Sequence, residues 1–155
     1  MERGVFTFGE EPAGRLYLAL LDASVAHCES MLLVQRASIG IGHRAKSLIE
    51  RLAPWLLEES QRSEWPGTKL HGDRALVRIF SLNRDSAEVL RSSAKRLYEW
   101  KQPALLEDLC LLRPSGEPWL VSIAHERDAY LRISEDERDR LVDAIPDLGV
   151  ILRYT

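Results

Sequence analysis

The spacing of hydrophobic positions in the first forty residues changes from a strand pattern to a helical one and back. Residues 5–8 alternate as a short strand, and residues 15–36 contain neither glycine nor proline. Within the longer segment, apolar side chains recur at spacings of three and four: Leu18, Leu21, Val25, Cys28 and Leu32. Residues 31–34 instead form a continuous apolar run, typical of a buried strand. We predict a helix to about Cys28 followed by a strand; one helix over the whole segment is the alternative.

The middle of the chain predicts two further helices and a strand. The first of these two helices is indicated by one apolar stripe: Ala45, Leu48, Ile49, Leu52 and Leu56. Pro54 kinks or restarts this helix, because proline lacks the backbone donor that a helix needs. Residues 75–82 predict a strand, paired across a turn at residues 71–73. Asp85 and Glu88 resemble a capping box that opens the second helix. Its core face is Leu90, Ala94, Leu97 and Tyr98.

After Pro103 the pattern changes to a period of two. Three strands of a meander are predicted at residues 109–112, 119–123 and 129–133. Ser134, with Glu137 three residues later, caps a last helix that Pro146 stops. Residues 150–154 close the chain as a strand.

These elements predict a single α+β domain. The chain of 155 residues has the length of one domain and contains no repeat or linker. Strands that follow one another in runs, with helices between the runs, favour a mixed or mainly antiparallel sheet. We expect a C-terminal three-strand meander and about four helices packed against the sheet.

Composition argues against some classes of function but does not identify the function itself. A net charge of −3 argues against a dedicated nucleic-acid binder. Residues 1–12 carry no apolar signal region, and the longest apolar run, residues 16–21, is far shorter than the about 20 residues of a membrane span. Cys28 and Cys110 look like small buried hydrophobes. We expect a cytoplasmic protein with no cofactor, no metal, no membrane contact and no nucleic-acid partner.

One segment, residues 40–47 (Gly-Ile-Gly-His-Arg-Ala-Lys-Ser), resembles a Walker A loop. It follows a predicted strand and opens a predicted helix, as that motif requires. It departs from the motif at Ala45, where glycine is expected, and no later strand ends in the aspartate that would hold magnesium. An irregular loop before an ordinary helix is the alternative. The candidate ligand-binding residues are Gly40, Gly42, Lys46 and Ser47.

Two turns carry groups suited to proton transfer. His71 and Asp73 flank a glycine, and His125 is followed directly by Glu126. A histidine beside a carboxylate titrates near neutral pH and serves acid/base chemistry. An aspartate that bonds its own backbone and a charged surface turn are the simpler interpretations. A zinc-protease motif is absent, because Ala129 stands where its second histidine would be.

Other features point to a protein partner. Trp65 lies in a predicted turn, where it either anchors a partner or caps the rim of the core. Residues 125–143 hold seven acidic side chains against four arginines. Glu135, Asp136 and Asp139 lie at the start of the last helix, where the helix dipole also favours acids.

The sequence therefore favours a non-catalytic cytoplasmic domain that binds a protein: an adaptor, a regulator or an immunity-type protein that neutralises a toxin. A phosphate- or nucleotide-binding protein and a small acid/base hydrolase are the alternatives.

Overall fold

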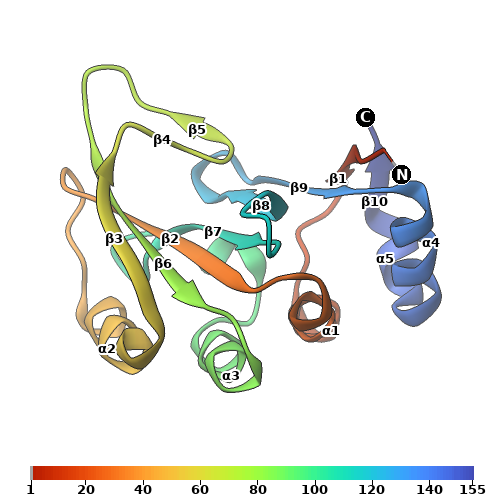
Figure 1. The fold of residues 1–155 in the computed structure, drawn as a ribbon, viewed down its shortest axis with the longest axis horizontal. Coiled ribbons are helices and arrows are strands. Elements are labelled where there is room, and N and C mark those ends of the chain that lie inside the picture. Colours follow the sequence, from red (N-terminus) through yellow and green to blue (C-terminus); the bar gives the residue numbers. More distant parts are fainter. Residues whose placement is uncertain (1) are drawn as a thin grey trace.

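The computed structural model describes residues 2–155, which form an α+β domain built on an antiparallel sheet (Figure 1). The eight strands of this sheet lie in the order β10-β1-β9-β8-β7-β2-β6-β3. Their bounds are β1 Gly4–Phe8, β2 Ser30–Arg36, β3 Leu56–Arg62, β6 Ala75–Ser81, β7 Glu107–Leu112, β8 Pro118–Ile123, β9 Asp128–Ile133 and β10 Leu152–Tyr154. A separate hairpin consists of β4 Glu64–Trp65 and β5 Thr68–Lys69.

The described residues contain five α-helices, where about four were expected: α1 Gly14–His27, α2 His43–Leu52, α3 Arg84–Ser93, α4 Glu135–Ala144 and α5 Pro146–Ile151. Helices α1, α2 and α3 lie side by side under one face of the sheet, and α4 and α5 stand together at its β10 end (Figure 1). No helix in residues 2–155 has the length and apolar character needed to span a bilayer.

Each strand of the sheet centre divides its side chains between two cores. In β2, Met31 and Leu33 point to the helix-side core, whereas Leu32 and Val34 belong to a second core on the opposite face. The β4–β5 hairpin covers this second core. Its turn residue Gly67 has φ 88° and lies so close to Val121 that a Cβ would come within 2.8 Å.

The first predicted break is confirmed, because α1 ends at His27 and β2 begins at Ser30. The next segment differs from prediction. Helix α2 ends at Leu52, a short 3₁₀ turn holds Pro54, and Leu56 begins β3 instead of completing a helical stripe. Because Pro54 lacks an N–H group, the helical hydrogen-bond ladder ends there, and the following residues form a strand.

The turn at residues 71–73 does not close the predicted hairpin. Strand β6 pairs with β2 and β3, and residues 64–69 between β3 and β6 form a separate hairpin. Asn83, not Asp85, caps α3, and its Oδ1 accepts the backbone N–H groups of Asp85 and Ser86. At the C-terminal end, α4 ends at Ala144, before Pro146, as predicted. Pro146 then opens a further helix, α5, where its fixed φ suits a first helical position. Val150 and Ile151 belong to α5 rather than to the predicted last strand, so β10 begins at Leu152.

Candidate functional site

Acidic side chains form a stripe along α4 next to an exposed tyrosine. Glu135, Asp136, Asp139 and Asp143 are exposed, and their spacing along α4 places them on one side of the helix. Tyr154, on strand β10, has 68% of its surface exposed. Glu135 and Tyr154 line the same hollow of about 350 Å³, together with residues 2–4 and Phe6. We call the four acidic residues of α4 together with Tyr154 the acidic C-terminal face; its members are Glu135, Asp136, Asp139, Asp143 and Tyr154.

The start of α4 is held by the predicted capping box. Ser134 Oγ accepts the N–H of Glu137 at 3.2 Å, and Glu137 Oε1 accepts the N–H of Ser134 at 3.0 Å. The cap satisfies backbone donors that the first turn of a helix leaves free. It also fixes the first turn of α4, which carries Glu135 and Asp136.

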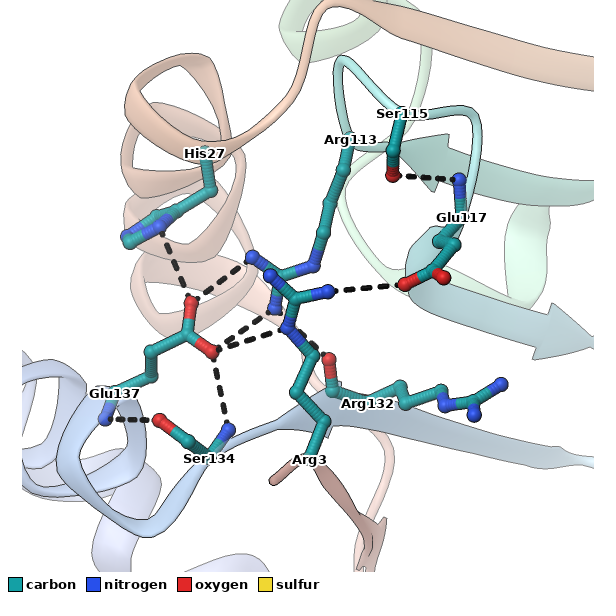
Figure 2. A network of polar contacts seen from close by, with 8 residues as sticks. All are labelled: Arg3, His27, Arg113, Ser115, Glu117, Arg132, Ser134 and Glu137. Carbon is teal, nitrogen blue, oxygen red and sulfur yellow. Dashed lines mark hydrogen bonds and ion pairs between the residues drawn. The ribbon is translucent and has the colours of Figure 1, made fainter. Parts of the chain in front are cut away.

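Glu137 is also the centre of a polar network that ties α4 to the rest of the molecule (Figure 2). Arg113, in the turn between β7 and β8, donates to both carboxylate oxygens of Glu137 at 3.0 Å. The same guanidinium donates to the carbonyl of Arg132 at 3.0 Å. Arg3 Nε and His27 Nδ1 each lie 3.7 Å from the Glu137 carboxylate. Four distant segments therefore meet at one carboxylate.

The pKa values of Glu137 and His27 are both shifted from their usual values. Burial opposes the charged form of Glu137, but the hydrogen bonds from Arg113 and from the backbone of Ser134 outweigh it, so its pKa lies below the usual value. The pKa of His27 is also lowered, mainly by burial and against the attraction of Glu137. The His27 ring stacks on Trp119, with centroids 5.5 Å apart.

The free charges of the acidic C-terminal face contrast with the paired charge of Glu137. In residues 2–155, no ion pair involves Glu135, Asp136 or Asp143, whereas Asp139 contacts its neighbour Arg138 at 2.7 Å. The Tyr154 ring packs edge-on against Phe6 at 5.1 Å, which leaves its other surface open. Exposed carboxylates beside an aromatic face suit lysine or arginine side chains.

A second polar group, which we call the Glu107 cluster, lies inside the sheet. It comprises Glu107, Asp108, Arg36, Trp65 and His125. Glu107 is fully buried, and its Oε1 lies 2.7 Å from His125 Nε2. Arg36 Nε lies 3.4 Å from the other oxygen of Glu107, and its guanidinium stacks over the Trp65 ring. The charge of Arg36 and the ring nitrogen of His125 lie on opposite sides of Glu107, and both offset part of the free energy of burying its carboxylate.

Asp108 adopts a backbone conformation that is uncommon for residues other than glycine, with φ 55°. Its carboxylate accepts Trp65 Nε1–H at 3.2 Å and the N–H of Ala124 at 3.1 Å. Burial raises the pKa of Asp108, and these two hydrogen bonds partly oppose the shift. Trp65 itself is only 5% exposed, so the structure supports its core interpretation over that of a surface anchor.

Sequence reasoning missed Glu107 and Asp108. Their signal was present, because two consecutive acids stand between Leu105-Leu106 and the apolar run at residues 109–112. Acidic residues are rarely buried without partners, so an acidic pair inside an apolar segment indicates a buried polar site.

The structure separates the candidate acid/base residues. His71 and Asp73 lie on an exposed loop, and Asp73 accepts the N–H of Arg74 at 2.8 Å, as an ordinary turn aspartate does. His125 is 43% exposed, and its carboxylate partner is Glu107 rather than its neighbour Glu126. In the described chain, no hydrogen bond or ion pair joins the two turns, and no group of metal ligands forms.

The loop that resembles a Walker A motif does follow β2 and open α2. One backbone N–H group of this loop is already bonded within the protein, because the N–H of Gly42 donates to the carbonyl of Pro103 at 2.8 Å. The side-chain amide of Gln102 donates to the backbone carbonyls of Ile39 and Gly40. Lys46 is exposed and Ser47 half-buried on α2. The sheet is antiparallel, unlike the parallel βαβ setting of phosphate-binding loops.

Comparison with known proteins adds no functional information. No protein-family model matches this chain, and no curated protein or solved structure is significantly similar to it.

Proposed function

We propose that the protein is a non-catalytic protein-binding domain that holds a basic segment of a partner on its acidic C-terminal face. The observation that carries the proposal is that Glu135 and Tyr154 line the same hollow and that Tyr154 is 68% exposed. A lysine or arginine placed there meets the carboxylates of Glu2 and Glu135 and an aromatic face together, while the charge of Arg3, which lines the same hollow, is paired with Glu117 at 2.9 Å.

The two kinds of side chain have separate roles in this proposal. Unpaired carboxylates attract a basic partner from a distance, so they raise the association rate and make it dependent on salt. Tyr154 supplies the contact area and a cation–π interaction of about 0.5–1 kcal/mol at an exposed site. Tyrosine is also among the residues that dominate measured interface energies.

The Glu137 network supports binding by keeping the face rigid. Because Arg113 and the capping box hold the first turn of α4, Glu135 and Asp136 need little ordering when a partner arrives. A surface that is already ordered loses less conformational entropy on association.

The test compares proteins captured from a cell lysate by the immobilised wild type and two charge-matched variants. The face variant is Glu135→Gln/Asp136→Asn/Asp143→Asn. The control variant, Glu10→Gln/Glu50→Gln/Glu64→Gln, removes the same charge from exposed positions elsewhere. We expect a stoichiometric partner on the wild type and the control, and about tenfold less on the face variant.

Tyr154→Ala should weaken capture of the same protein without changing its salt dependence. Equal capture by the face and control variants would contradict the proposal, as would the absence of any stoichiometric protein on the wild type. Circular dichroism of each variant verifies that the domain is folded.

A second candidate function, proton transfer at His125, is favoured by its 2.7 Å contact with the buried Glu107. With Nε2 held by Glu107, Nδ1 is the nitrogen free to act as a base. In ester hydrolysis, Nδ1 takes a proton from water as the water oxygen attacks the carbonyl. The proton then passes to the departing alkoxide, and the ester C–O bond breaks.

The probe for this second candidate is p-nitrophenyl acetate. We expect His125→Gln to lower the hydrolysis rate about tenfold or more, within the usual contribution of general acid–base catalysis. His71→Gln is the matched control, since it removes an exposed histidine from another loop. Equal losses in the two variants would indicate ordinary imidazole reactivity rather than a site.

A further inference from the structure

Among the described residues, strand β3 forms one edge of the sheet and pairs with β6 alone. It contains no proline, its charged side chains Glu58, Glu59 and Arg62 carry both signs, and its register shift against β6 is confined to its start, between Leu56 and Glu58. Leu57, at its start, is 65% exposed. We propose that β3 pairs antiparallel with β3 of a second copy of this chain, which continues the sheet across a twofold axis at Ser60.

The register with β6 assigns the β3 side chains to the two faces of the sheet. Ser60 and Arg62 lie opposite Val77 and Ala75, which belong to the second core, so they point to that face. Glu58 lies opposite Ile79 and shares the face. Glu59 and Gln61 therefore point to the other face.

A twofold axis perpendicular to the sheet keeps each side chain on its own face, so the axis must pass through a residue of β3. Centred on Glu58 or on Glu59, the pairing places that glutamate directly opposite its own copy. Centred on Gln61, it pairs only three residues of β3 and brings Glu58 opposite Glu64. Like charges directly opposite each other destabilise a strand pair.

Centred on Leu56, Leu57 or Arg62, the pairing joins at most three residues of β3, and the first two centres lie at the register shift between Leu56 and Glu58. Pairing centred on Ser60 joins the five residues 58–62, and its charges are complementary. Glu58 of each copy faces Arg62 of the other, Glu59 faces Gln61, and Ser60 faces Ser60. Within one chain, Arg62 Nη2 already lies 3.3 Å from Glu58 Oε1. The dimer thus assembles four alternating charges on one face, while strand pairing satisfies the free backbone groups of both edges.

This dimer leaves the acidic C-terminal face open, because β3 and β10 are the opposite edges of the sheet. The inference does not rest on the proposed function. If both hold, the dimer presents two binding faces at the far ends of one continuous sheet.

The register is tested by cysteine cross-linking under mild oxidation. Ser60→Cys places two thiols directly opposite each other, within reach of a disulfide. Gln61→Cys is the control, since each new thiol then faces Glu59 and lies diagonally from its copy, too far for a disulfide. Cys28 and Cys110 are both buried and do not compete. We expect a covalent dimer from Ser60→Cys and little from Gln61→Cys; equal yields would overturn the register.

The interface itself is tested by charge exchange, with mass measured by sedimentation equilibrium. Glu58→Arg and Arg62→Glu each place like charges opposite each other, and each should raise the dimer dissociation constant about tenfold or more. The double variant Glu58→Arg/Arg62→Glu restores complementarity and should dimerise like the wild type. A wild type that is monomeric at about 100 µM overturns the proposal, as does a double variant that is no tighter than the single ones.

Discussion

Arg113 and Glu137 lie 24 positions apart in the chain and form a two-point ion pair in which both hydrogen bonds are 3.0 Å long. Arg113 is buried, so its charge is stabilised by this carboxylate and by the carbonyl of Arg132 rather than by solvent. The pair joins the β7–β8 turn to α4, the helix that carries most of the acidic C-terminal face.

Arg113→Met should destabilise the domain by about 2 kcal/mol, because it removes charged hydrogen bonds from a largely buried carboxylate. Urea denaturation followed by circular dichroism measures the effect. Arg3→Met is the matched control. Arg3 contacts the same carboxylate from a more exposed position, so its loss should cost less than about 1 kcal/mol. Equal effects of the two variants would contradict the central role of Arg113.

Stability should fall when the pH drops below the ordinary pKa of histidine. The folded pKa of His27 lies below its usual value of 6.5, so the unfolded chain binds the proton first. The contribution of neutral His27 is therefore complete above that value and is lost as the pH falls toward the folded pKa. Glu137, whose pKa is also lowered, acts in the same direction at lower pH. Free energies of unfolding at about pH 7.5 and about pH 5.5 should differ less in His27→Gln than in the wild type. An equal difference in the two proteins would exclude His27 as the cause.

Asp108→Ala should destabilise the domain by about 2–3 kcal/mol, since Trp65 Nε1–H and the N–H of Ala124 both lose a buried acceptor. Alanine also adopts φ 55° poorly. Asp108→Asn should cost less, because asparagine keeps one acceptor oxygen and tolerates this conformation. Urea denaturation followed by tryptophan fluorescence tests both variants. An asparagine variant less stable than the alanine one would contradict this account.

Both native thiols should resist modification. Burial raises the pKa of Cys28 and of Cys110 to about 12, so little of the reactive thiolate exists near neutral pH. Native protein treated with Ellman's reagent at about pH 8 should release almost no colour, and protein in denaturant should release the colour of two thiols. Fast labelling of the native protein would mean that one of the two is accessible.

The α+β class and several local elements could be predicted from the sequence, because their signals lie within a few residues. The continuous apolar run at residues 31–34 located the boundary of α1 and β2, and Ser134 with Glu137 located the start of α4. Leu56 was misplaced because it continues the helical spacing of α2, although Pro54 interrupts the hydrogen-bond ladder before it.

The partners of polar side chains depended on contacts across the fold. His125 and Glu126 are neighbours in the chain, yet the carboxylate that binds His125 is Glu107, 18 positions away, because neighbouring strands bring the two together. Arg113 gave no local sign of its link to Glu137. Local spacing and capping act over one or two helical turns, so the sequence determined where many elements begin and end. Burial and charge pairing join residues that only the folded chain brings together, so the tertiary structure decided which side chains meet and which remain unpaired.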